Sequence, residues 1–256
     1  MDRTPHTIIT SSWIPSFQWL DGWSVINDAV AMQVPCVWLI NPKSFIGALP
    51  RHVDSLLSAD ELAKAMRFHQ ADHVLRFKAA HTALRLVLGH VTDQDPAGIR
   101  FAKGHHHKPL LENQHGPEVP FNLSYTENRA MIGLTSSQTV GVDIEWCERP
   151  FDIETMLDAC FSAAEIAFIR EQRENMLYRF FTLWTRKEAI LKLTGEGIGD
   201  HLPHFEVLDG VCHAQKQIIG GRPPDQVFLY SFEVEEGFIG CLASPRPLPE
   251  ISFYRL

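Results

Sequence analysis

The chain has 256 residues, 45% of them hydrophobic, and a formal net charge of −8 at pH 7. This length is enough for one large domain or two modest ones with a buried core. The acidic balance argues against bulk nucleic-acid binding, which needs a basic face. No apolar run approaches the roughly 18 residues that a membrane span requires, so we predict neither nucleic acid nor membrane as a partner.

The cysteines and the first residues bear on the cellular compartment. The start MDRTPHTIITSSW lacks a charged segment followed by an apolar one, so it does not resemble a signal peptide. The five cysteines show no CxxC spacing, which argues against a zinc site or a disulfide framework. We therefore predict a cytoplasmic protein with reduced cysteines.

The first part of the chain predicts a strand followed by helices. Residues 1–33 are rich in tryptophan and give no clear element, whereas 34–41 is typical of a strand. A helix is predicted over 57–68, because Ser58 and Glu61 have the spacing of a capping box.

A second, longer helix is predicted over 72–89, with Gly89 as its C-terminal stop. Strands are then predicted at 119–126, 130–135 and 140–146. The alternation and β-branched content of these segments favour a sheet.

The last third of the chain begins with helices. One is predicted over 161–172, capped by Ser162, and a longer one over 177–195, ending at Gly195. The final sixty residues are typical of strands and turns.

These elements occur twice. The segment from Ser58 to Leu62 resembles the segment from Ser162 to Ile166, at an offset of 104 residues. A strand precedes each capped helix and a longer helix follows it, which indicates two related halves. We predict subdomains at 34–137 and 138–256, with 1–33 as an N-terminal segment of unclear role. A chance match between short helical patterns is the alternative.

The strand VGVDIE carries two carboxylates. Alternate side chains of a strand share a face, so Asp143 and Glu145 lie side by side and repel unless a cation lies between them. Glu188 and Lys192 share a face of the long helix. Three carboxylates from Asp143, Glu145 and Glu188 would suit Mg²⁺ or Mn²⁺. Alternatively, the strand pair is an exposed face and Glu188–Lys192 an ordinary helix pair.

Two motifs taken together resemble a known family. GVDIE at 141–145, followed by WTRKEAILK at 184–192, resembles the signature of the 4′-phosphopantetheinyl transferases. KGHHHKPLL at 103–111 and FNLSYTENRAMIGL at 121–134 resemble supporting segments of that family, in the same order.

The helices at 57–85 resemble those of the longer, two-halved, surfactin-type members, and the resemblance covers about residues 35–245. It implies an α+β fold, in which a pseudo-twofold pair of similar α/β subdomains each packs a small antiparallel sheet against helices.

The resemblance also implies an activity. Members transfer the 4′-phosphopantetheine arm of coenzyme A to a serine of an apo acyl or peptidyl carrier protein, and adenosine 3′,5′-bisphosphate is released. Asp143, Glu145 and Glu188 would bind Mg²⁺, Glu188 would act as the general base, and Lys192 would neutralise phosphate charge. The protein would be a monomer.

By the same resemblance, coenzyme A would be bound by Lys192 and by five further residues from the first half and the linking segment. These five are Lys64, Arg76, Lys108, Ser124 and Tyr125.

The sequence departs from the family pattern at two places. Tyr125 stands where the family has histidine, so it can donate a hydrogen bond but carries no positive charge. His105–His107 replace the usual Gly-Lys-Pro start, and we expect a solvated loop rather than a metal site there. A metal-dependent phosphoesterase and a non-catalytic module that binds coenzyme A or carrier protein are the alternative functions.

Overall fold

The structure is a computed structural model of the chain. Its residues divide into two compact units: unit 1 comprises 1–16, 104–108 and 137–248, and unit 2 comprises 17–103, 109–136 and 249–256. No helix within the described part of the chain has the length and apolarity to cross a bilayer. The described residues are 5–27, 34–49, 52–104, 108–112, 119–135, 139–150, 152–219 and 223–256.

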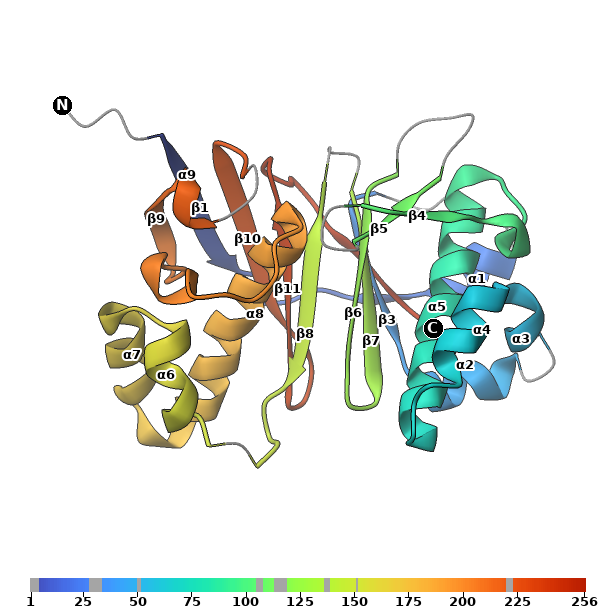
Figure 1. Cartoon of the computed structure of the whole chain (residues 1–256), viewed down its shortest axis with the longest axis horizontal. Helices are drawn as coiled ribbons and strands as arrows, with labels where there is room; N and C mark the ends of the chain where they lie inside the picture. Colours follow the sequence, from blue (N-terminus) through green and yellow to red (C-terminus); the bar gives the residue numbers. More distant parts are fainter. Residues whose placement is uncertain are drawn as a thin grey trace. The chain divides into compact units, whose positions relative to one another are not determined.

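Unit 1 contains a five-stranded sheet in the order β8-β11-β10-β1-β9 (Figure 1). The pairs β8–β11, β11–β10 and β1–β9 are antiparallel, and β1–β10 is parallel. The strands are β1 (His6–Trp13), β8 (Gly141–Trp146), β9 (Gly210–Gln215), β10 (Gln226–Glu235) and β11 (Phe238–Ser244).

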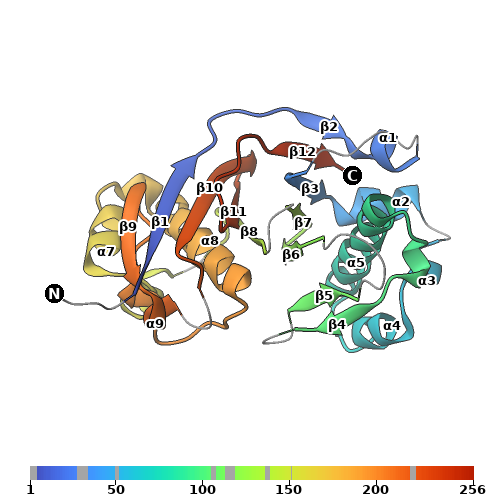
Figure 2. The ribbon, with the colours of Figure 1, turned by 90° about the horizontal axis from the view of Figure 1, so that it is seen from above.

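The long helix α8 of unit 1 packs against β8, β10 and β11, as the view from above shows (Figure 2). Its C-terminus is set by Gly195, whose φ of 80° places it in the left-handed region that favours glycine. The helices are α6 (Glu154–Cys160), α7 (Ala163–Arg170), α8 (Met176–Thr194) and α9 (Lys216–Ile219).

Unit 2 has a five-stranded sheet in the order β2-β12-β3-β7-β6, and a separate hairpin of β4 and β5. The pairs β3–β7 and β7–β6 are antiparallel, whereas β12 runs parallel to β2 and β3. The strands are β2 (Trp19–Asp21), β3 (Cys36–Ile40), β4 (Phe101–Lys103), β5 (Pro109–Leu111), β6 (Phe121–Thr126), β7 (Arg129–Leu134) and β12 (Ser252–Arg255).

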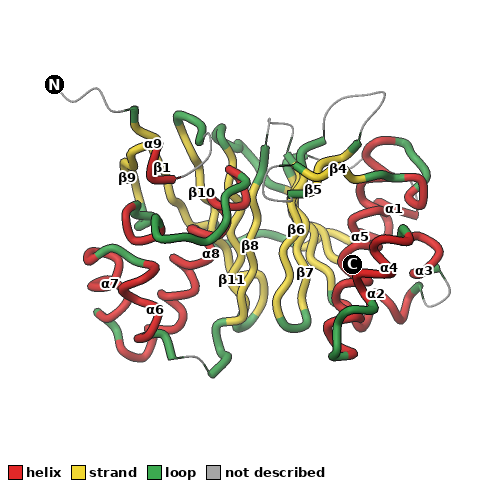
Figure 3. The backbone as a smooth tube through the Cα atoms, in the orientation of Figure 1, coloured by secondary structure: helices red, strands yellow, loops and turns green. Residues whose placement is uncertain are grey.

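The helices of unit 2 gather on one side of its strands (Figure 3). The longest of them, α5, contacts β3, β6 and β7 and buries a stripe of alanine, leucine and valine against them. The helices are α1 (Gly22–Asn27), α2 (Pro42–Ala48), α3 (Val53–Leu56), α4 (Ala59–Ala65) and α5 (Ala71–Thr92).

The predicted capping box at Ser58 and the predicted cap at Ser162 are both present, and each is linked to the following long helix. Ser58 caps α4 together with Glu61, and the buried Glu61 carboxylate pairs with Arg85 of α5 at 2.8 Å. Ser162 caps α7 in the same way with Glu165, which pairs with a lysine of α8. In each unit the strand that precedes these helices also pairs with a β-hairpin. In unit 2, β3 pairs with the hairpin of β6 and β7, and in unit 1, β8 pairs with the hairpin of β10 and β11. The predicted α+β fold with internally similar halves is therefore confirmed.

The boundaries of the units differ from the predicted ones at both ends of the chain. Residues 1–33 do not form a separate segment, because β1 belongs to unit 1 whereas β2 and α1 belong to unit 2. Residues 249–256 were predicted to belong to the second subdomain, but they belong to unit 2, where β12 lies between β2 and β3 in the sheet. Strand pairing between distant parts of the chain is not visible in local sequence patterns, so these boundaries could not be predicted.

Helix α5 also continues past its predicted stop. Gly89 lies inside the helix, which ends at Thr92 and is followed by Asp93 in the left-handed region, with φ of 53°. A Cβ at Gly89 would lie 2.8 Å from the Gln94 carbonyl oxygen and from a ring carbon of Pro96. The glycine therefore serves close packing against the chain that follows the helix, not helix termination.

Candidate active site

The site begins where β8 meets α8. A Cβ added to Gly141 would collide with the carbonyl oxygen of Ala189 and lie 2.6 Å from the backbone nitrogen of Leu193. The backbones of strand and helix therefore approach each other so closely that only glycine fits at this position. This contact brings the carboxylates of the strand and the side chains of the WTRKEAILK helix into the same region of unit 1.

Replacement of Gly141 by alanine should therefore destabilise the protein by about 3 kcal/mol or more, because backbone atoms must move to make room. The measurement is urea-induced unfolding of the full chain. Gly197→Ala is the matched control, since a Cβ at Gly197 has no neighbour within 4 Å. Equal stability of the two variants would contradict the close contact between β8 and α8.

The three predicted metal ligands influence one another electrostatically. Asp143 is only 4% exposed, and Glu145 is partly buried on the same strand. The pKa of Glu188 is raised to about 7, chiefly by burial and then by the carboxylate of Asp143, with a smaller effect of Glu145 and an opposing one of Lys192. Oε1 of Glu188 is buried and has no hydrogen-bond partner among the described residues.

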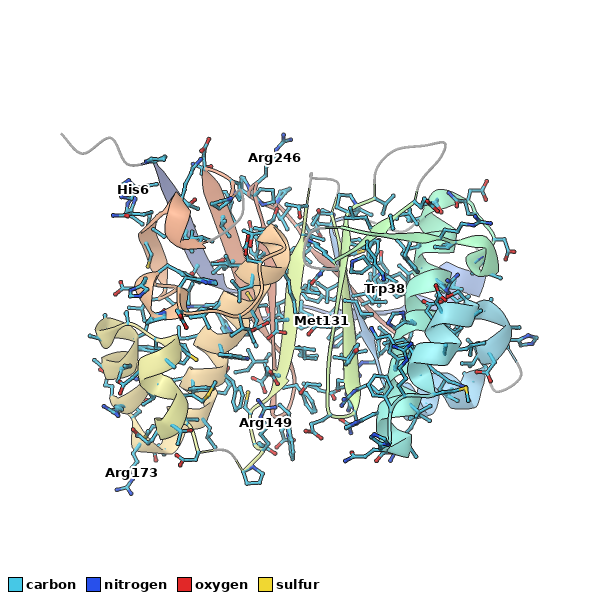
Figure 4. All side chains as sticks on the ribbon, in the orientation of Figure 1. His6, Trp38, Met131, Arg149, Arg173 and Arg246 are labelled. Atoms are coloured by element: carbon cyan, nitrogen blue, oxygen red, sulfur yellow. The ribbon has the colours of Figure 1, made fainter. Side chains whose placement is uncertain are left out.

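Two cations lie among these carboxylates. The Lys192 ammonium donates a hydrogen bond of 2.6 Å to Oδ1 of Asp143. Arg149 pairs with Glu145 at 3.4 Å, and its guanidinium lies over the ring of Phe181, 4.6 Å from the ring centroid. Figure 4 shows Arg149 beyond the C-terminal end of β8. Each strand carboxylate therefore has a cationic partner from the same unit.

The sequence predictions did not include Arg149. It follows Glu145 by four residues, but that spacing signals an ion pair only on a helix, and this segment is a strand end followed by a turn. Its position over Phe181 of α8 depends on tertiary packing, which no local pattern reveals.

The donor set fits a hard divalent cation. Carboxylate oxygens are the ligands that Mg²⁺ prefers, and the buried Oε1 of Glu188 is an acceptor without a donor among the described residues. No group of three histidine, cysteine or acidic residues in the described ranges is already arranged as a metal site. Binding by all three carboxylates would thus require side-chain movement, and the assignment of Asp143, Glu145 and Glu188 as ligands stays a prediction.

Lys187, the neighbour of Glu188 in the motif, points elsewhere. Its side chain is fully buried, pairs with Glu165 at 2.8 Å, and donates hydrogen bonds to the carbonyl oxygens of Leu202 and Phe205. Adjacent positions of a helix face different directions, so Glu188 can face the carboxylates while Lys187 joins α8 to α7. Lys187 has a structural role in this arrangement.

Lys108 also has partners other than the expected phosphate. Its ammonium donates to the carbonyl oxygens of Val140, at 2.9 Å, and Lys192, at 2.6 Å, and it contacts the Thr139 hydroxyl at 3.2 Å. Burial lowers the pKa of Lys108 to about 8. In this structure the side chain therefore anchors the end of α8 to the start of β8. The histidines that precede it, at 105–107, lie outside the described residues.

The remaining predicted coenzyme A ligands lie in unit 2. Arg76 of α5 donates to the Glu127 carbonyl oxygen at 2.6 Å, and its guanidinium lies 5.4 Å from the ring centroid of Tyr125. Nε of Arg76 is buried without a hydrogen-bond partner among the described residues. The exposed Lys64 of α4 lies over the ring of Phe77 of α5. The structure thus brings Arg76 and Tyr125 together.

Ser124 and Tyr125 are neighbours on β6, so their side chains point to opposite faces. Tyr125 packs against the core of unit 2, whereas Ser124 is buried on the other face. Because β6 is the outer strand of its sheet, a ligand that contacts both residues would have to lie along the sheet edge. The role of Ser124 and Tyr125 in ligand binding stays a prediction.

Comparison with known proteins gives the same family as the motifs. The family model of the 4′-phosphopantetheinyl transferase superfamily matches residues 139–239, which include β8 and α8. The chain is 34% identical over 147 residues to the 4′-phosphopantetheinyl transferase HetI of Nostoc sp., covering 56% of the chain and 61% of HetI. It is 25% identical over 196 residues to Sfp of Bacillus subtilis, covering 75% and 84%.

A third relative, psf-1 of Bacillus pumilus, is also named a 4′-phosphopantetheinyl transferase. It is 30% identical over 191 residues, covering 74% of the chain and 80% of psf-1. The chain therefore belongs to the 4′-phosphopantetheinyl transferase superfamily, and the predicted family is confirmed. The chain thus aligns with 61% of the length of HetI and with 61% of the length of a putative transferase from Synechocystis. It aligns with a larger share of Sfp, 84% of its length.

Proposed function

We propose that the protein transfers the 4′-phosphopantetheine arm of coenzyme A to a serine of an apo acyl or peptidyl carrier protein, in an Mg²⁺-dependent reaction. The observation that carries this proposal is Glu188. It is a partly buried carboxyl whose pKa is raised by burial and by the neighbouring charges of Asp143 and Glu145, in a family whose relatives are named for this activity. A cytoplasmic location and a monomeric state are further predictions.

Glu188 is the proposed general base. Its Oε1 has no hydrogen donor among the described residues, so this oxygen is available to accept a proton. The proton of the carrier serine would pass to Glu188, directly or through one water molecule.

The bond changes are those of a phosphoryl transfer. The serine oxygen forms a bond to the β-phosphorus of coenzyme A, and the bond from that phosphorus to the bridging oxygen breaks. The electron pair leaves with adenosine 3′,5′-bisphosphate. A divalent cation held by Asp143, Glu145 and Glu188 would act as a Lewis acid toward the diphosphate. Lys192, one helical turn after Glu188, would donate to a phosphate oxygen.

The residues of unit 2 would bind the nucleotide part of coenzyme A. Arg76 supports this role best, because its buried Nε has no hydrogen-bond partner among the described residues and its guanidinium already packs over Tyr125. A guanidinium with an unused donor is suited to a phosphate group. Lys64, Ser124 and Tyr125 are the further proposed ligands, and Lys108 would contribute only after leaving its carbonyl partners.

A transfer assay tests the proposal. The protein is incubated with apo carrier protein, coenzyme A and Mg²⁺, and mass spectrometry detects phosphopantetheine on the carrier. We expect transfer by the native protein and a loss of about 100-fold or more in Asp143→Ala, because electrostatic stabilisation of phosphoryl transfer depends on the metal site. The matched control is Asp158→Ala, which removes an exposed carboxylate of α6 and should keep full activity.

The outcomes separate the three candidate functions. No transfer to any of several carriers would contradict the proposal. Cleavage of coenzyme A without a carrier would instead indicate a metal-dependent phosphoesterase. Binding of coenzyme A or carrier that survives Glu188→Ala, without transfer by the native protein, would indicate a non-catalytic module. Full transfer by Asp143→Ala would contradict the assigned metal site.

A further inference from the structure

Lys192 makes a contact that its proposed role toward phosphate does not explain. Its ammonium lies 2.6 Å from Oδ1 of Asp143, one of the three proposed metal ligands. The Asp143 side chain is 5% exposed and that of Lys192 is 26% exposed, so the carboxylate is buried whereas the lysine side chain also reaches solvent. Both residues belong to unit 1.

A divalent cation and this ammonium compete for the same carboxylate. Mg²⁺ binds oxygen at about 2.1 Å, so a metal on Oδ1 and the ammonium at its present distance would lie within about 5 Å of each other. Like charges at such a separation repel strongly in a partly buried site. Among the described residues the three carboxylates are not arranged as a ready metal site.

The surrounding structure lets the side chain move while its backbone stays in place. The carbonyl oxygen of Lys192 accepts a hydrogen bond of 2.6 Å from the partly buried ammonium of Lys108, which also donates to the carbonyl oxygen of Val140, the residue before β8. The long, partly exposed side chain of Lys192 can therefore turn away from Asp143 without loss of the last turn of α8.

We propose that Lys192 is an internal cation on Asp143 that a divalent metal displaces, so that metal binding delivers the ammonium to the diphosphate of coenzyme A. The proposal rests on the proposed function above, because it needs a metal and a diphosphate at this site. It predicts that Lys192 weakens metal binding when coenzyme A is absent. It also predicts that metal and coenzyme A bind cooperatively, since the diphosphate gives the displaced ammonium a new partner.

The test is the affinity for Mn²⁺, measured by electron paramagnetic resonance of the unbound ion, for the full chain with and without coenzyme A. Lys192→Met should bind Mn²⁺ more tightly than the native protein without coenzyme A, on the order of tenfold. Coenzyme A should raise the Mn²⁺ affinity of the native protein more than that of the variant.

Two further variants make the result specific. Lys192→Gln removes the charge with a polar side chain and should give the same change, which guards against a folding defect of one variant. Lys216→Met removes a lysine of the same unit that pairs with Asp225, and it should leave the Mn²⁺ affinity unchanged.

Each outcome decides one question. Unchanged or weaker Mn²⁺ binding in both Lys192 variants, with binding by the native protein, would overturn the displacement proposal alone. An absence of Mn²⁺ binding by the native protein, with and without coenzyme A, would instead contradict the metal site of the proposed function. Tighter binding in the Lys216 variant as well would show a general charge effect and would also overturn the proposal.

Discussion

Glu188→Gln should lose transfer activity by about 10²- to 10⁴-fold, because glutamine cannot accept the serine proton. The same variant should be more stable than the native protein at pH 8 when divalent cations are absent. Gln is close to Glu in shape but carries no charge, so it removes the cost of burying a charged carboxylate and of holding it near Asp143 and Glu145. Lost activity together with a gain in stability would show that the Glu188 carboxylate serves the reaction at a cost to stability. A residue with a purely structural role would lose stability when replaced.

The pH dependence of this stability difference has a defined sign. The pKa of Glu188 is raised in the folded protein from its ordinary value of 4.5 to about 7. Between these values the folded state holds a proton that the unfolded state lacks, so the contribution of Glu188 to the free energy of unfolding falls as the pH rises from 4.5 to 7. The full shift corresponds to about 3 kcal/mol, and we expect about 1–3 kcal/mol because Glu188 is only partly buried.

Urea-induced unfolding at pH 5 and pH 8, without divalent cations, measures this effect. The advantage of Glu188→Gln over the native protein should be small at pH 5 and larger at pH 8. Glu174→Gln changes an exposed glutamate of the same unit and should show no such difference. A Glu188→Gln protein that is less stable than the native one at pH 8 would contradict the electrostatic description of the site.

Lys187→Met should cause the largest loss of stability, about 3–5 kcal/mol. Glu165 and Lys187 are both fully buried, and the substitution leaves the carboxylate of Glu165 without its cation. Burial raises the pKa of Glu165 and lowers that of Lys187, because desolvation disfavours both charges, and their pairing opposes this effect. The carbonyl oxygens of Leu202 and Phe205 would also lose their donor.

Unfolding in urea again provides the measurement, and a second substitution provides the control. Glu165→Gln combined with Lys187→Met should recover part of the loss, because it removes the unpaired charge. Lys78→Met breaks the more exposed pair with Asp54 and should cost no more than about 1 kcal/mol. If Lys187→Met kept full stability and lost only transfer activity, a chemical role for Lys187 would replace the structural one.

The outcome of each sequence prediction depended on the distance over which its signal acts. The capping box at Ser58, the N-cap at Ser162 and the helix end at Gly195 were predicted correctly, because each is decided within one helical turn. The stop at Gly89 was wrong, since a packing contact with Pro96 and not a local turn requires glycine there. The places of β1 and β12 in the sheets could not be predicted, because strand pairing joins residues far apart in the chain.

The sequence by itself determined the family and the α+β fold, and it named Asp143, Glu145 and Glu188 as predicted metal ligands, since motif residues and their spacing are local. Only the tertiary structure decided what those residues contact. It placed the ammonium of Lys192 on Asp143, buried Lys187 against Glu165, and raised the pKa of Glu188 to about 7. Burial and charge at a site are set by neighbours from distant segments, and for that reason the chemical state of Glu188 was invisible in the motif that contains it.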